Sequence, residues 1–218
     1  MAANILVDST LSIYNSGQNG LPLTQSATNQ IGYFQSNDTT FPIQSGIVMV
    51  AAQNASDVIA STNGAGNNVT FTDTELASVL TQLGSSGYAI KDMVEIEFSF
   101  IAQSDSISFN YCFGSHEYDG YTCSNFNDVF GFFLEGSYIN GTTAPTGQTI
   151  VRNIATIPGT IIPIAVNTIN SGSPSGSYPA SNCTSANPNF VAHSTYYNAS
   201  NGSITTLDGY TDKFTAKA

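Results

Sequence analysis

Hydrophobic and polar residues alternate along much of this chain, which is the pattern of a β-strand with one solvated face. In residues 94–100, VEIEFSF, apolar side chains occupy every second position, with Glu or Ser between them. Residues 107–113, ISFNYCF, alternate in the same way. The short polar stretch at 103–106 predicts a turn, so the two strands are expected to form a β-hairpin.

Three longer apolar stretches predict further strands. Residues 128–134, DVFGFFL, suit a central strand that is buried on both faces. Residues 46–52, GIVMVAA, suit a second buried strand. Residues 161–169, IIPIAVNTI, alternate again, and Pro163 favours an edge strand or a strand start because proline has no N–H to donate.

One helix is predicted near residues 73–83. Thr72 and Glu75 have the spacing of a capping box, in which each side chain accepts a backbone N–H at the helix start. The apolar residues of one helical face follow: Leu76, Val79, Leu80 and Leu83. Gly84 is the predicted stop.

Residues 17–29, 61–68 and 171–188 are rich in Gly, Ser, Asn and Pro and are predicted to be loops. No internal repeat and no clear linker divides the chain. Many short strands, one short helix and long polar loops are typical of a single all-β domain over residues 1–218. The expected fold is an antiparallel β-sandwich, or a jelly-roll-like variant of it.

Charged residues are scarce, and this composition excludes some classes of binding partner for the protein. They make up 9% of the 218 residues, and the net charge is −11 with only four Lys or Arg. Because so few cations cannot neutralise a phosphate backbone, nucleic-acid binding is not expected. No apolar run is long enough to span a bilayer, and the first ten residues lack a signal-peptide pattern, so membrane insertion is not expected either.

The segment 114–133, GSHEYDGYTCSNFNDVFGFF, gathers acids and amides with no Lys or Arg among them. Its hard oxygen donors are Glu117, Asp119, Asn127 and Asp128. Ca²⁺ takes about six to eight such oxygens in proteins, so these residues are a candidate calcium site. In the alternative interpretation, Asn127 and Asp128 cap the turn before the next strand and Glu117 accepts backbone N–H groups.

The same region allows three other chemistries. Glu117 and Asp128 are the residue types of a glycosidase acid and base, although the chain has no Trp to stack on a sugar. A Ser-His-Asp triad would need His116 or His193, and the chain has no GxSxG motif. Zinc would need His116, Glu117 and a reduced Cys112. None of these motifs is complete, so a non-enzymatic role is expected.

Aromatic side chains accompany the acids. Tyr118, Tyr121 and Phe126 are candidates for the rim of a ligand site. The phenylalanines of residues 128–134 are instead expected in the core, because they belong to a nearly continuous apolar run.

Three cysteines are present, Cys112, Cys123 and Cys183, and none has the CxxC spacing of a zinc ribbon. In an exported protein this number predicts one disulfide and one free thiol. The pairs Cys123–Cys183 and Cys112–Cys123 both remain open on this count.

Residues 109–136, FNYCFGSHEYDGYTCSNFNDVFGFFLEG, resemble the central motif of the choice-of-anchor L domain family, close to F-x-Y-x-F-x-S-E-E-Y…C…F-N-D-V-F-x-F-F-L-x-G. Further segments agree with the family in the same order: QIGYF and GIVMVAA (30–34 and 46–52), NIATIPGTIIPIAVNTIN (153–170) and LDGYTDKFTA (207–216). His116 departs from the family, which has Glu there, and the family's closing Pro-Cys segment does not follow Ala218. We therefore expect a domain whose last strands are missing from this sequence or come from another chain.

The resemblance implies an extracellular, cell-surface module for adhesion or surface-filament assembly. Expected partners are other copies or neighbouring surface domains, by strand complementation, and glycans. The alternative is a carbohydrate-binding or carbohydrate-cleaving domain that uses Glu117 and Asp128. In the family a Cys after the acidic motif and one in the later Gly/Ser/Asn-rich loop occur together, so the resemblance also implies a Cys123–Cys183 disulfide and a buried free thiol at Cys112.

Overall fold

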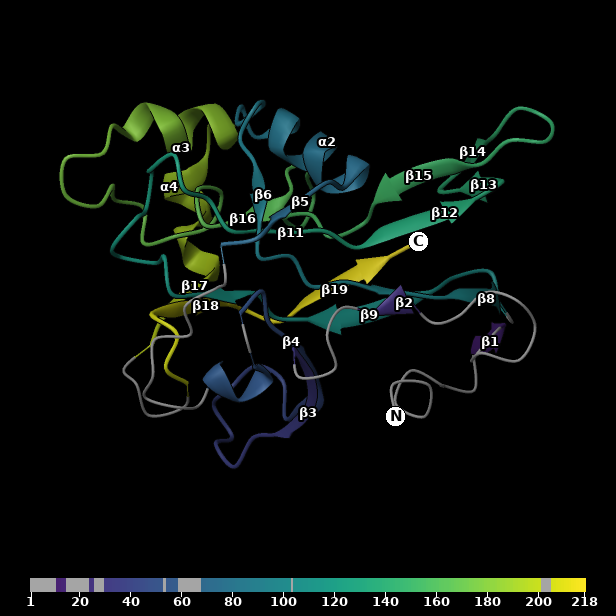
Figure 1. The fold of residues 1–218 in the computed structure, drawn as a ribbon, viewed down its shortest axis with the longest axis horizontal. Helices are drawn as coiled ribbons and strands as arrows, with labels where there is room; N and C mark the ends of the chain where they lie inside the picture. The colour runs from purple at the N-terminus through teal and green to yellow at the C-terminus, as the bar shows by residue number, and fades with distance from the viewer. Residues whose placement is uncertain are drawn as a thin grey trace. The chain divides into compact units, whose positions relative to one another are not determined.

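The computed structural model describes residues 11–14, 24–25, 30–52, 54–58, 68–102, 104–200 and 205–218 (Figure 1). Strands account for 31% and helices for 15%, and every strand pair is antiparallel, so the predicted all-β class is confirmed. The described strands form two- and three-stranded sheets, and the sandwich itself stays a prediction. The predicted loops at 17–29 and 61–68 lie almost wholly outside the described residues.

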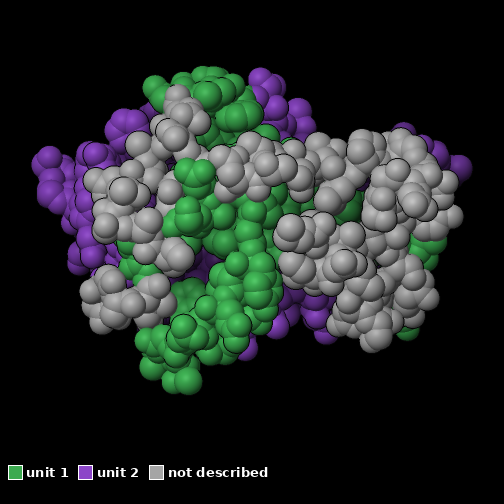
Figure 2. Space-filling view, turned by 60° about the horizontal axis from the view of Figure 1, so that its bottom comes forward, with its two compact units in different colours: residues 1–71, 90–107, 204–206 green, residues 72–89, 108–203, 207–218 purple. Residues whose placement is uncertain are grey.

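The chain divides into two compact units, which Figure 2 colours separately. Unit 1 comprises residues 1–71, 90–107 and 204–206. Its strand pairs are β1 (Leu11–Tyr14) with β8 (Ser99–Ala102), β2 (Thr24–Gln25) with β7 (Ile96–Glu97), β3 (Ile31–Gln35) with β4 (Ser45–Met49), and β5 (Thr70–Phe71) with β6 (Ile90–Lys91). A 3₁₀ helix, η1 (Ala55–Val58), follows β4.

Unit 2 comprises residues 72–89, 108–203 and 207–218 and contains the acidic segment. Its three-stranded sheet has the order β10 (Gly114–Ser115), β18 (Gly209–Thr211) and β17 (Tyr197–Ala199). Its other pairs are β9 (Ser108–Tyr111) with β19 (Phe214–Lys217), β11 (Val129–Phe130) with β16 (Ile164–Ala165), β12 (Phe133–Gly136) with β15 (Ile150–Asn153), and β13 (Tyr138–Ile139) with β14 (Thr142–Thr143).

The predicted hairpin of residues 94–100 and 107–113 is wrong. β8 pairs with β1, and β9 pairs with β19, which comes from the end of the chain. The predicted alternation is nevertheless present, because Phe98 and Phe100 are half-buried and Ser99 between them is exposed. Alternation decides which side chains face the core, but it leaves the hydrogen-bonding edges free to pair with any strand.

The predicted central strand at 128–134 is also divided. β11 and β12 are separated by Gly131 and Phe132, and the N–H of Phe132 donates to Asn153 Oδ1 (3.0 Å) instead of to a strand. A Cβ on Gly131 would come within 2.4 Å of the Phe133 ring, so any other residue would have to displace that ring. The core role of the phenylalanines is confirmed: Phe130 and Phe132 pack on a buried cluster that includes Ile157 and Ile164. The predicted strands at 46–52 and 161–169 are shorter, as β4 and β16, and β4 is only half-buried.

The predicted helix is α2 (Thr74–Gln82), but Asp73 rather than Thr72 caps its start. Asp73 Oδ1 accepts the N–H of Leu76 at 2.6 Å. At the other end Gly84 has a φ of 74°, and it is the stop that the sequence predicted. Val79 and Leu83 are buried against a cluster that includes Ala165 and Ala186.

The prediction of only one helix is wrong, because residues 171–188 are not all loop. They contain α3 (Ala180–Ala186), and α4 (Phe190–His193) and the 3₁₀ turn η2 (Ser194–Tyr196) follow. Proline at the N-cap of α3 makes no side-chain capping bond, so the start of α3 carries no local signal.

Candidate functional site

The acidic segment connects two short strands of unit 2. β10 pairs with β18 and β11 pairs with β16, and these ladders hold the two ends of the loop 116–128. The hydroxyl of Ser115 donates to Asp128 Oδ2 at 2.6 Å and accepts the N–H of Glu117 at 2.8 Å. Ser115 is buried, and this bridge ties the start of the loop to its last residue.

Glu117 and Asp128 lie close together and share one electrostatic environment. The backbone N–H of Asp128 lies near the Glu117 carboxylate and favours its charged form. Burial, and then the charge of Asp128, raise the pKa of Glu117 to about 7. Burial also raises the pKa of Asp128, while the hydroxyl of Ser115 and the charge of His116 act in the opposite direction. Asp128 is densely surrounded by protein but keeps exposed surface, so solvent and ions can still reach this acid pair.

Asp119 belongs to a different group of acids. After the larger effect of burial, its charge raises the pKa of Asp208 and also that of Tyr197. His116 is near enough to Asp128 and to Asp208 to lower the pKa of each. His116 therefore lies between the two groups of acids and supplies positive charge when it is protonated. Sequence reasoning missed Asp208, although it stands in the C-terminal segment that resembles the family.

Asn127 takes the turn-stabilising position of the alternative interpretation. Its Oδ1 accepts the N–H of Asn167 at 2.9 Å, which anchors the loop to the segment after β16. Within the described residues, its Nδ2 and the Oε2 of Glu117 are buried atoms without a hydrogen-bond partner. No group of three or more His, Cys, Asp or Glu in that part of the chain is arranged to hold a metal ion, so the calcium site stays a prediction.

The Cys123–Cys183 disulfide implied by the resemblance is present and joins residues 60 positions apart. It links the acidic loop to α3, and both cysteines are fully buried. The N–H of Cys123 donates to Asn167 Oδ1 at 2.7 Å, and its carbonyl accepts from Asn182 Nδ2 at 2.9 Å. The loop is thus held by covalent and hydrogen bonds in addition to its two strands.

The positions of Cys112 and His193 do not support the alternative zinc site or the Ser-His-Asp triad. Cys112 is the free cysteine, half-buried rather than buried, and its S–H donates to the carbonyl of Thr211 at 3.1 Å. Burial raises the pKa of this thiol to about 12, whereas zinc needs a thiolate. His193 is bonded through Nδ1 to the amide of the buried Asn187 at 2.8 Å, which is a structural position at the end of α4.

The aromatic residues of the loop separate into a core residue and an exposed set. Tyr118 is fully buried and packs against Tyr197, so the structure removes it from the predicted rim. Tyr121 and Phe126 are 45% and 64% exposed and meet edge to face with ring centroids 5.9 Å apart. Tyr178 stacks on Tyr121 with ring centroids 6.4 Å apart. We call Tyr121, Phe126 and Tyr178 the aromatic face.

These features define a class of protein: a charge-poor antiparallel β domain with a disulfide, as in proteins that work in oxidising surroundings. The chain belongs to the choice-of-anchor L domain family, whose sequence profile matches residues 1–218. No curated protein and no solved structure matches the chain.

Membership of this family makes the chain an extracellular, surface-associated module, and it points to a surface anchor rather than to an enzyme. Within the described part of the chain, no helix has the length and apolar composition needed to cross a bilayer.

Proposed function

We propose that this domain takes part in adhesion or surface assembly by docking its aromatic face on another copy or a neighbouring surface domain. The observation that carries the proposal is the exposure of Tyr121 and Phe126 on a loop held by the Cys123–Cys183 disulfide. Aromatic rings dominate the energetics of many protein contacts because each buries a large area. A loop that is already held in place loses little entropy on binding.

The composition of the chain favours such a contact. Only 9% of its residues are charged, and the centres of protein interfaces are depleted of charge. Strand complementation is a second contact that we propose. β3 and β4 form the longest ladder, five residue pairs, with no third strand among the described residues. A strand edge of this kind can pair with a segment from another chain.

The adhesion proposal is tested with a double variant, Tyr121→Ser with Phe126→Ser. We expect its binding to immobilised copies of the domain to fall at least about tenfold, because a few aromatic residues carry most of the binding energy in many interfaces. The matched control is Tyr88→Ser with Tyr138→Ser, which removes two tyrosines that are 51% and 66% exposed elsewhere. Surface plasmon resonance measures both. An equal loss in the control, or no binding by the wild type, contradicts a role of the aromatic face in self-association.

We also propose that calcium stabilises the acid pair above neutral pH. Support comes from the buried, unpartnered Oε2 of Glu117 and from the exposed surface of Asp128 beside it. Asn127 Oδ1 accepts from Asn167 and Asp119 lies near Asp208, so Glu117 and Asp128 would hold the ion, with water and backbone carbonyls completing the usual six to eight or so ligands. An ion and a proton compete for the same carboxylates, which makes binding dependent on pH.

We therefore expect millimolar calcium to raise the melting temperature, relative to EDTA, at pH 8 but not at pH 5.5. A ligand at a hundredfold excess over its dissociation constant stabilises by about 2.7 kcal/mol, so a shift of several degrees is measurable by calorimetry. Asp128→Asn is expected to remove the shift, and Asp105→Asn, at an exposed position in the other unit, to keep it. A shift of the same size in Asp128→Asn, or none in the wild type, would sink the calcium proposal.

A further inference from the structure

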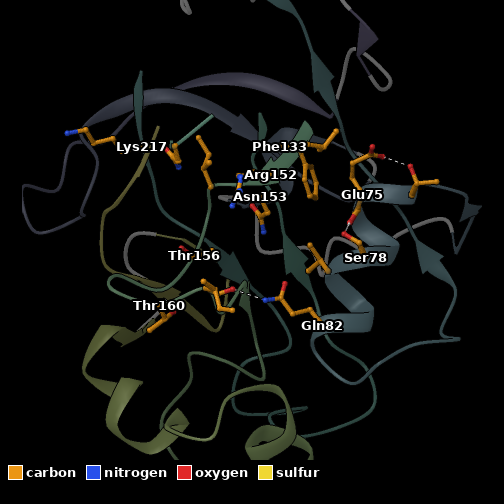
Figure 3. A pocket seen from close by; sticks show the side chains of 15 residues that line it. Glu75, Ser78, Gln82, Phe133, Arg152, Asn153, Thr156, Thr160 and Lys217 are labelled. Atoms are coloured by element: carbon orange, nitrogen blue, oxygen red, sulfur yellow. Dashed lines mark hydrogen bonds between the residues drawn. The ribbon is translucent and has the colours of Figure 1, made fainter. Parts of the chain in front are cut away.

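An open pocket of about 640 Å³ lies within unit 2, away from the acidic loop (Figure 3). One wall is α2, and the others come from β12, β15, the segment that follows β15, and the end of β19. Figure 3 shows Glu75, Ser78 and Gln82 of α2 on one side, Thr156 and Thr160 on the other, and Arg152 and Asn153 between them. Small-molecule sites in proteins have volumes of about 300–1,000 Å³, so this pocket can hold a ligand of that class.

Part of the pocket surface is apolar and exposed. Phe133 and Val79 line it, together with Val151 and Ile161, which are 45% and 81% exposed. When a ligand covers exposed aliphatic surface beside a concave site, that surface leaves water, and the free energy of the complex falls. The occupant must therefore present an apolar or C–H face to this wall.

Asn153 supplies an oriented donor without a partner. Its Oδ1 accepts the N–H groups of Phe132 and Ala155, both at 3.0 Å, and these two bonds fix the direction of the amide. Its Nδ2 is buried and has no hydrogen-bond partner within the described residues. Leaving such a donor unpaired costs roughly 1–3 kcal/mol, so a ligand that brings an acceptor is favoured at this point.

Two basic residues line this pocket, in a chain that has few of them. Arg152 and Lys217 line the pocket and are two of the four basic residues, against a net charge of −11. The guanidinium of Arg152 donates to Thr142 Oγ1 at 2.7 Å, which holds the side chain and leaves its other N–H groups for a ligand. Lys217 reaches outward at the rim in Figure 3. Glu75 is the acid of the pocket, and its Oε2 accepts from the hydroxyl of Thr74.

We propose that this pocket binds a hexuronic acid, a sugar ring that carries a carboxylate. The carboxylate pairs with the Arg152 guanidinium, a ring hydroxyl accepts from Asn153 Nδ2, and the C–H face of the ring covers Phe133 and Val151. A purely apolar acid would leave Asn153 Nδ2 without an acceptor, and a neutral sugar would leave Arg152 without its anion. The proposal stands independently of the aromatic face.

The test compares glucuronate and galacturonate with glucose and galactose by saturation-transfer NMR and isothermal calorimetry on the whole domain. We expect a uronate to bind at least about tenfold more tightly than its neutral counterpart, because one good charged contact is worth that factor. Arg152→Gln is expected to abolish this preference. Arg152 is exposed, so the substitution should leave the fold intact, which circular dichroism checks. Lys213→Gln is the matched control, since it removes the same charge from an exposed position that does not line the pocket.

Four results of these binding measurements would overturn the proposal, and a competition with phosphate can give a fifth. They are no binding of either uronate, equal binding of the neutral sugars, an unchanged preference in Arg152→Gln, and a loss in Lys213→Gln as large as that in Arg152→Gln. Inorganic phosphate is the competitor that separates anion binding from sugar recognition. If phosphate displaces the uronate at equal concentration, the pocket is an anion site without selectivity for a sugar, and the proposal is wrong.

Discussion

At the scale of single residues, the acidic segment shows how a chain with few cations accommodates buried acids. Glu117 is half-buried beside Asp128, and its pKa of about 7 means that it holds a proton where an ordinary carboxyl does not. Ser115 donates to Asp128, and His116 lies near enough to act on its charge. Bound protons and hydrogen bonds from neighbouring residues therefore stabilise these carboxyl groups, as Lys and Arg side chains do in other proteins.

This arrangement predicts that stability falls as pH rises from about 4.5 to about 7. The pKa of Glu117 in the folded state, about 7, exceeds its ordinary value of 4.5, so folding favours the protonated form. The contribution is fully present below pH 4.5 and is lost as the pH rises through 7. After allowance for solvent screening of a half-exposed side chain, the change in unfolding free energy is about 1–2 kcal/mol.

Glu117→Gln is expected to remove that dependence and to be more stable than the wild type at pH 8 by a similar amount. Urea unfolding between pH 4.5 and 8.5 measures the effect. Glu97→Gln, which removes the same charge from an exposed strand position, serves as the control. A slope in Glu117→Gln as steep as that of the wild type would show that Glu117 does not carry the pH dependence.

At the scale of elements, α2 shows how closely spaced capping residues compete. Thr72 and Asp73 both precede the helix, and the Asp73 carboxylate accepts the N–H of Leu76. At the C-terminal end, the N–H of Ser85 donates to Leu80 and that of Gly84 to Thr81, which is the Schellman arrangement. The positive φ of Gly84 makes this possible.

The second prediction of this Discussion concerns the N-cap of α2, Asp73. Asp73→Ala should lower the unfolding free energy by about 1 kcal/mol, the usual value of an N-cap, because the first turn of α2 loses its acceptor. Thr72→Ala, one position earlier and exposed, should change it by only a few tenths of a kcal/mol or so. Thermal melts of the two variants show which residue caps α2. A larger loss of unfolding free energy in Thr72→Ala than in Asp73→Ala would support the capping box that the sequence predicted.

At the scale of the whole molecule, covalent cross-linking and charge set the limits of stability. The net charge of −11 favours expansion of the chain through self-repulsion. The disulfide between Cys123 and Cys183 opposes this, because it closes a loop of about 60 residues that contains most strands of unit 2.

The third prediction is that Cys123→Ser with Cys183→Ser lowers the unfolding free energy by about 4 kcal/mol, the entropy of closing a loop of this length. Cys112→Ser should change it by less than about 1 kcal/mol, because Ser keeps the donor to the carbonyl of Thr211. Denaturant unfolding of both variants, with and without a reductant, provides the comparison. If the reductant destabilises the wild type no more than the double variant, the disulfide has no part in stability.

Much of the local structure was predictable from the sequence. The alternation at 94–100 and 107–113, the helix near 73–83 and its stop at Gly84 all follow from side-chain periodicity and backbone sterics, which act over a few residues. The family motif also placed the disulfide. The Asn140-Gly141 turn between β13 and β14 was available in the sequence as well, since both residues have positive φ, as the favoured hairpin turn requires.

Strand partners and the environment of the acids were decided by the tertiary structure. β9 pairs with β19, about a hundred residues away along the chain. The alternation of apolar and polar residues could not predict this pair, because it shows which face of a strand is buried and not which strand lies beside it. Asp208 joins Asp119 and His116 only when β18 lies beside β10, and α3 starts at a proline without a cap. The sequence by itself determined the faces, turns and family of this protein. Long-range packing, which rests on contacts that no local pattern encodes, decided pairing, burial and therefore the pKa values of the acids.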